Sequence, residues 1–274
     1  WLYSKFGGWR PVFLLIGTLG FLWLIAWRLL YHPPESHPRV SAAEREMILK
    51  DKLESAAEHA ATLSAAERPD ARWSELIRLP HTWGVLAARA LTDPVWFFVT
   101  DWFAIYLVTK GFQVEETLLA FWIPFVAADL GNFYGGGMSS WLIRRGWPVL
   151  RARKAVIVFG GIRITLINTT IFTANLFAVA ALFAVSTFAY AAFSTMALVL
   201  PSDLYRSESV ATVSGMSGTA AGLGTILSTY LIGYVADRYS FAPILVVASL
   251  IPLVGMALVL LLLRPTAAPR EAHN

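Results

Sequence analysis

The sequence contains no cysteine, so neither disulfide bonds nor thiolate metal sites can contribute to its structure. Charge is also scarce, because Asp, Glu, Lys and Arg make up 15% of the chain against 57% hydrophobic residues. A typical soluble domain carries about 25% charged residues, and a mean hydropathy of +0.58 is well above what such domains have. The deficit of charge predicts a protein that crosses the lipid bilayer several times.

Motifs of catalysis are missing as well. HExxH, GxSxG and the phosphate-binding loop do not occur, so we expect neither an enzyme nor a bound cofactor. His32 and His37 could form a metal pair, but loop histidines beside a membrane are usually solvated, and no metal site is expected. The chain begins at Trp1 without a signal peptide, and we interpret it as a piece of a longer sequence.

Seven segments are long and apolar enough to cross a hydrocarbon core of about 30 Å, which takes roughly 20 helical residues. They are 11–31, 84–109, 117–142, 155–173, 175–200, 209–236 and 242–263. The 143–154 loop holds five basic residues and no acidic one, which places it in the cytoplasm by the positive-inside rule. The net charge of +4 therefore reports orientation, and nucleic acid is not an expected partner.

The long loop 32–83 and the tail 265–274 then lie in the cytoplasm by parity. HPPESHP opens the loop where a helix must stop, and the following segment predicts an amphipathic helix with Ser41 as N-cap and Glu44 completing a capping box. KFGGWRPVFLL in the first span is similar to RYSFAPILVV in the last. This internal similarity suggests that 1–31 ends one six-span unit and that 84–264 forms a second, complete unit.

Charged residues inside the spans need partners, because a charge at the bilayer centre costs at least a few kcal/mol. Asp129 and Arg163 have similar estimated depths on neighbouring antiparallel spans, so we expect them to pair, either to fix packing or to serve transport. Asp101 lies among aromatic residues in the outer half of its span. It is either part of an aromatic belt or a carboxylate that binds and releases a proton. Asp93-Pro94 predicts a kink in the same helix.

Small and hydroxylated residues mark several spans. Glycines at 131, 135, 136 and 137, and at 215, 218, 222 and 224, predict faces where another helix backbone approaches closely. Such faces serve static packing and moving bundles alike. Hydroxyl groups on the fifth and sixth spans, at Ser194, Thr195, Ser214, Ser217 and Thr219, either satisfy backbone carbonyls or contact a substrate.

Several longer segments carry a family resemblance. They are GGWRPVFLLIGTLGFLWLIAWRLLYHPPESHPRVSAAER, LTDPVWFFVTDWFAIYL, WIPFVAADLGNFYGGGMSSWLIRRGWPVLRARK, LPSDLYR and SGMSGTAAGLGTI. Together they resemble the major facilitator superfamily, and within it the anion:cation symporter family and its hexuronate or sugar-acid branch. The resemblance covers nearly the whole chain.

This resemblance implies an all-α integral membrane fold of twelve spans in two halves. The chain would hold the last span of the first half and the complete second half. It implies symport of a small organic anion with a proton or sodium ion by alternating access, in a bacterial inner membrane. The substrate-binding residues would be Trp96, Thr100, Asp101, Asn132, Tyr190, Ser194 and Ser217, and the charged or coupling residues Asp101, Asp129 and Arg163. Arg144, Arg145, Arg151, Arg153 and Lys154 would form the cytoplasmic gate.

A seven-span receptor or sensor is the alternative, because seven spans place the amino terminus outside and the carboxyl terminus inside. The chain even contains Asp237-Arg238-Tyr239, which resembles a receptor motif. The tripeptide follows the sixth span on the outer side, however, whereas receptors carry it on the inner side of the third. A retinal protein is disfavoured, since the last span has no lysine for a Schiff base.

Overall fold

The computed structural model describes Lys5, residues 7–33, 37–50, Leu53, 73–205 and 207–263, with the backbone alone at 114–119 and 207. Within these ranges all regular structure is helical. The chain divides into two units, residues 1–59 and 60–274. Each is described by itself below.

The first unit contains one long helix, α2 (Arg10–Leu30), which has no buried residue within the unit. Pro11 stands in its first turn, where the missing N–H costs no helical hydrogen bond. At about 30 Å the helix has the length of a bilayer core. Further along, residues 42–50 are helical and the Ser41 hydroxyl oxygen accepts a hydrogen bond of 3.2 Å from the Glu44 N–H. The predicted N-cap is therefore confirmed, while the rest of that predicted helix lies largely outside the described residues.

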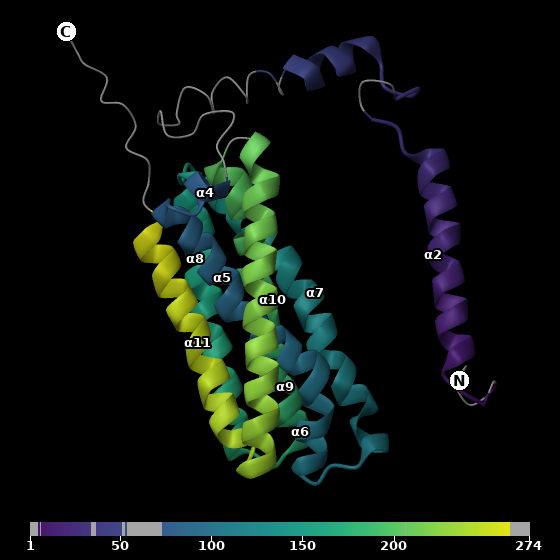
Figure 1. Cartoon of the computed structure of the whole chain (residues 1–274), viewed down its shortest axis with the longest axis vertical. Helices are drawn as coiled ribbons and strands as arrows, with labels where there is room; N and C mark the ends of the chain where they lie inside the picture. Colours follow the sequence, from purple (N-terminus) through teal and green to yellow (C-terminus); the bar gives the residue numbers. More distant parts are fainter. Residues whose placement is uncertain are drawn as a thin grey trace. The chain divides into compact units, whose positions relative to one another are not determined.

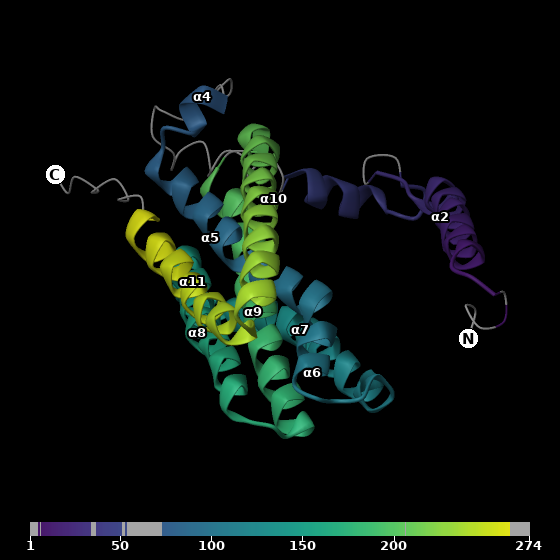
Figure 2. The same cartoon turned by 60° about the horizontal axis from the view of Figure 1, so that its bottom comes forward.

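The second unit is a bundle of six long helical segments joined by short connections (Figures 1 and 2). A short helix, α4 (Trp73–Leu76), precedes them. The segments are α5 (Pro80–Phe97) continued by the π-helix η2 (Phe98–Trp102) and α6 (Phe103–Thr109), α7 (Val114–Arg144), α8 (Val149–Ile164) continued by the 3₁₀ helix η3 (Thr165–Phe172), α9 (Leu176–Leu204), α10 (Ser207–Arg238) and α11 (Phe241–Leu262). The predicted spans match these segments to within a few residues at most ends.

Contacts between helix ends establish that successive segments alternate in direction. At one end, Thr82 at the start of α5 shares a hydrogen bond of 2.6 Å with the Tyr205 hydroxyl, just after α9. Lys154 near the start of α8 donates there to the Leu263 carbonyl, which follows α11. At the other end, the Lys110 ammonium after α6 donates to the Thr170 carbonyl of η3 at 2.9 Å. This alternation agrees with the prediction that successive spans cross the membrane in opposite directions.

A membrane crossing is supported by length and hydropathy for six segments. These are α2, the α5–η2–α6 segment, the α8–η3 segment, α9, α10 and α11. The 31-residue helix α7 is not among them, and its residues 114–119 are described by their backbone alone. The chain is thus a multi-pass membrane protein, and the crossing by α7 stays a prediction.

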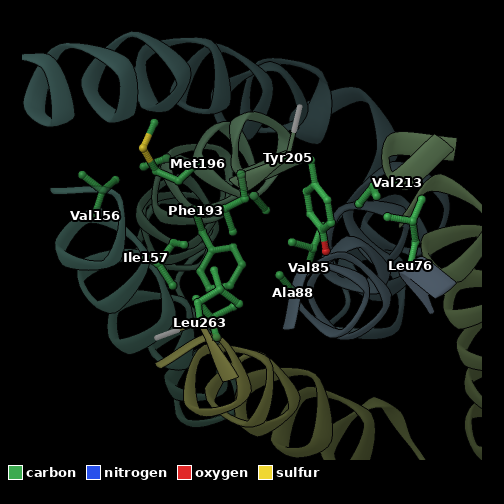
Figure 3. Packing of buried hydrophobic residues seen from close by; sticks show 14 residues of the cluster. Leu76, Val85, Ala88, Val156, Ile157, Phe193, Met196, Tyr205, Val213 and Leu263 are labelled. Carbon is green, nitrogen blue, oxygen red and sulfur yellow. The ribbon is translucent and has the colours of Figure 1, made fainter. Parts of the chain in front are cut away.

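A hydrophobic cluster holds the α5, α8, α9 and α11 helices together at the end where α4 lies (Figure 3). Phe193 and Met196 of α9 are fully buried in it, as are Ile157 of α8 and Val85 of α5. The Tyr205 ring also lies in the cluster and joins it to α5 through Thr82.

Glycines let helix backbones meet at two seams. A Cβ atom on Gly135 of α7 would lie 2.9 Å from the Ala192 Cα atom of α9. In α10, Gly224 lies against the Ala90 carbonyl of α5, which has no helical N–H partner because Pro94 stands four residues later. By contrast, a Cβ atom on Gly136 or Gly137 would meet nothing within 4 Å. The predicted glycine faces therefore divide into packed and open ones.

Alanine at Gly135 should destabilise the protein by about 1–3 kcal/mol, because the added methyl group forces α7 and α9 apart. Alanine at Gly136 is the matched control. It meets open space, and alanine favours a helix over glycine by about 0.8–1 kcal/mol. Thermal unfolding of both purified variants in detergent measures the difference. Equal unfolding midpoints would contradict a close seam between α7 and α9.

Candidate functional site

A buried polar network joins α5 to α9. Asp93 in α5 is 5% exposed, and its Oδ2 atom accepts hydrogen bonds from Arg89 Nε at 2.9 Å and Arg89 Nη2 at 2.6 Å. The Tyr190 hydroxyl of α9 donates to the other oxygen, Oδ1, at 3.2 Å. Hydrogen bonds in which both groups carry a charge are among the strongest in proteins. The network therefore fixes the position of a carboxylate and a guanidinium between two membrane-spanning helices.

An aromatic wall adjoins this network. The Trp96 ring, one turn after Asp93, stacks on Tyr190 with ring centroids 5.8 Å apart and planes at 11°. Phe125 of α7 meets the edge of Trp96 at 5.6 Å. Aromatic side chains placed beside a few polar groups are typical of small-molecule sites. Three helices, α5, α7 and α9, thus supply one continuous wall.

Polar side chains of α7 and α9 lie beside the wall. The Thr195 hydroxyl donates to Asn132 Oδ1 at 2.8 Å and links the two helices. Ser194 follows Tyr190 by one helical turn on α9. Asn132 is exposed and both hydroxyl residues are half-buried, so these groups remain accessible. Of the sequence-predicted residues, the structure stacks Trp96 on Tyr190, whereas Asn132 contacts Thr195 and Ser194 follows Tyr190 on the same helix.

Thr100 and Asp101 lie in the π-helix η2, one turn beyond Trp96. The Thr100 hydroxyl donates to Asp101 Oδ1 at 3.1 Å, and Asp101 is exposed. Single π-helical turns inside α-helices occur frequently at functional sites. The irregular turn follows Pro94 by four residues, slightly later than the kink predicted at Asp93-Pro94. Ser217 of α10 is buried and donates to the Ser214 carbonyl at 3.0 Å, which is the backbone-satisfying arrangement.

Asp129 and Arg163 were expected to interact directly or through one residue, and they form no direct ion pair in the structure; an interaction through an intervening residue stays a prediction. In the described part of the chain the side-chain ion pairs are Arg89–Asp93 and Arg153–Asp203. Tyr134 is the α7 residue whose ring meets Phe159 of α8, at 5.0 Å, and Asp129 is turned from Tyr134 by about 140° around the helix. Asp129 therefore faces away from α8. The Arg163 guanidinium lies over the Phe159 ring at 5.7 Å.

The predicted gate residues do not form a single group. Arg153 donates to Asp203 at 2.8 Å and to the Ser139 hydroxyl at 2.8 Å, which connects α8 with α9 and α7. Lys154 donates to carbonyls at the end of α11, those of Leu260 at 3.2 Å and Leu263. The other three residues, Arg144, Arg145 and Arg151, are exposed. These three remain available for contacts beyond the unit.

The sequence analysis missed Arg89, and at Asp93 it predicted only a kink of the helix. Their spacing could have identified the pair, because oppositely charged residues four positions apart lie on the same face of a helix. The structure adds that this face is turned toward Tyr190, so the pair is covered by a neighbouring helix.

Polar and aromatic groups thus gather between helices of a multi-pass membrane protein. Comparison with known families agrees. The chain belongs to the Major Facilitator Superfamily, whose family model matches residues 1–152 and 146–274. The resemblance predicted from the sequence is thereby confirmed.

Curated relatives are transporters of sugar acids by name. The hexuronate transporter of Escherichia coli K12 is 27% identical over 272 residues, which cover 97% of this chain and 61% of the relative. The D-galactonate transporter of Escherichia coli O6:H1 is 30% identical over 250 residues, covering 90% of this chain and 57% of the relative. The probable galactarate/D-glucarate transporter of Escherichia coli K12 is 31% identical over 254 residues, covering 91% and 57%. This chain thus spans about three-fifths of the length of these relatives.

Proposed function

We propose that the protein is a symporter that carries a hexuronate or a related sugar acid across a bacterial inner membrane together with a proton or a sodium ion. The substrate class is supported by the relatives named above, whose substrates all combine a carboxylate with a chain of hydroxyl groups. The observation that carries the proposal is the polar and aromatic wall around Tyr190. It offers a cation for the carboxylate of a sugar acid, polar groups for its hydroxyls and stacked aromatic rings for the face of its sugar ring.

Alternating access is the proposed mechanism. The open glycine positions support it, since a Cβ atom on Gly215, Gly218 or Gly222 of α10 meets nothing within 4 Å. A second helical unit can approach closely along such a face and rock against it. The exposed gate arginines, Arg144, Arg145 and Arg151, are proposed to contact that unit when the cytoplasmic side is closed.

The receptor alternative has no comparable support. The matched relatives are transporters by name, and a receptor does not need a charged pair enclosed between helices beside an aromatic wall. An intramembrane charge pair is costly, and such residues usually mark a substrate or ion pathway.

Uptake by intact cells tests the function. Cells without their own sugar-acid transporters, supplied with the protein at its full natural length, should accumulate labelled glucuronate against its gradient. A protonophore should abolish the accumulation if the proton is the coupling ion, and removal of sodium should do so if sodium is. Cells that take up no more glucuronate than the empty-vector cells would contradict the proposal.

Asp101 is the carboxylate that we propose as part of the coupling. Asp101→Asn keeps the shape and removes the carboxyl group, so proton-driven accumulation should fall about tenfold or more while exchange of substrate across the membrane survives. Asp237→Asn, an exposed carboxylate at the end of α10, is the control. Unchanged accumulation by the Asp101 variant would remove this residue from the coupling.

A further inference from the structure

Arg89 has unused hydrogen-bonding capacity. A guanidinium carries five N–H groups, and the two that are engaged, on Nε and Nη2, both point at the same oxygen of Asp93. In the described part of the chain no contact engages Nη1, and this atom is not among the buried polar atoms without a partner. The arginine side chain is 17% exposed. One edge of the guanidinium therefore remains open.

The open edge has the geometry of a carboxylate site. Arg89 uses its Nε–Nη2 edge for Asp93, and this leaves the Nη1–Nη2 edge at the end of the side chain. Each edge presents two parallel N–H groups, the fork that matches the two oxygens of a carboxylate. Asp93 holds the guanidinium in place without occupying that fork, and Tyr190 in turn holds Asp93. The arginine is thus oriented in advance for a second anion.

Neighbouring groups match the remainder of a sugar acid. Because Arg89 reaches forward one turn to Asp93, its guanidinium lies at the level of that residue, and Trp96 follows three residues later, about 4.5 Å along the helix. This separation is comparable to the size of a six-carbon sugar ring. Donors and acceptors for ring hydroxyls are available on Ser194, one turn after Tyr190 on α9, and on Asn132, which contacts Thr195. A carboxylate at Arg89 would place the ring against Trp96.

We infer that Arg89 is the residue of this unit that binds the substrate carboxylate, and hence the residue that makes the site prefer a sugar acid to a neutral sugar. The inference rests on the proposed function and adds the group that sets its specificity. Asp93 is a positioning residue that compensates the charge of Arg89 while the site is empty. With a substrate anion bound, one negative charge is left over, which the co-transported cation balances.

The test compares glucuronate with its methyl ester, which is uncharged and larger by one methyl group. Binding to the purified full-length protein is measured by calorimetry. The unaltered protein should bind the acid about 10- to 100-fold more tightly than the ester, the range of a charge-assisted hydrogen-bonded contact. Arg89→Gln should bind both ligands alike. Arg238→Gln, which removes an exposed arginine over Tyr234, should keep the preference for the acid.

A paired variant covers the case in which Arg89→Gln fails to fold. Arg89→Gln combined with Asp93→Asn leaves no buried charge without its partner. This double variant should also lose the preference for the acid while still binding the ester. A preference for the acid that persists in either variant overturns the inference alone. An unaltered protein that binds neither ligand overturns the proposed function together with it.

Discussion

Replacing Arg153 by alanine should destabilise the protein by about 3–5 kcal/mol, the usual loss when one partner of a buried ion pair is removed. Asp203 would keep its charge with a side chain only 16% exposed. The Ser139 hydroxyl, on a residue that is fully buried, would lose its donor as well. Three helices, α7, α8 and α9, meet at this one guanidinium, so the loss affects the packing of all three.

Arg151→Ala is the matched control, since this arginine is exposed on the same helix two residues earlier. Thermal unfolding of both variants in detergent measures the difference. The double variant Arg153→Ala with Asp203→Ala should recover part of the stability, because it leaves no stranded charge. Equal midpoints for the Arg151 and Arg153 variants would show that the pair is not important for packing.

Replacing Trp96 by alanine should reduce sugar-acid uptake by about tenfold or more. A stacked ring contributes about 0.5–1.5 kcal/mol beyond its buried area, and the lost area adds to this. The change also releases Tyr190, which donates to Asp93, so the arginine that is proposed to bind the carboxylate becomes less well positioned. Trp96→Phe keeps an aromatic ring on Tyr190 and should retain much of the uptake.

Trp122→Ala serves as the control for that prediction, because Trp122 is 67% exposed on α7. Uptake is normalised to the amount of folded protein in the membrane, so that a loss of yield is not read as a loss of transport. If the Trp96 and Trp122 variants transport equally well, the aromatic wall is not the substrate site.

Hydropathy alone predicted the helices well, because a bilayer fixes their length and favours continuous apolar runs. The predicted span 84–109 corresponds to Pro80–Thr109, and the predicted span 175–200 to α9. Ends were less predictable, since α9 and α10 continue for several residues past their apolar cores. Helix α7 was recognised in spite of its polar residues and glycines, and it is also the helix whose crossing stays a prediction.

The candidate site was predicted only in part, because the sequence does not show in which direction each side chain points around its helix axis. Depth in the bilayer can be estimated by counting residues, but contact also requires that two side chains face each other. Asp129 and Arg163 have similar estimated depth, but Asp129 is turned by about 140° around α7 from Tyr134, the residue whose ring contacts α8. Tyr190 and Trp96 were identified as separate candidates, whereas their stacking and their link to Asp93 depend on how α5 and α9 pack.

Counterflow in proteoliposomes tests the central claim most directly, because it needs no ion gradient and reports translocation alone. Vesicles that contain the full-length protein are loaded with unlabelled glucuronate and diluted into labelled substrate. If the protein transports sugar acids, labelled glucuronate should accumulate transiently. Labelled glucose should not accumulate in vesicles loaded with glucose. Equal counterflow of glucuronate and glucose, or no counterflow of glucuronate, would contradict the proposal that the protein is a sugar-acid transporter.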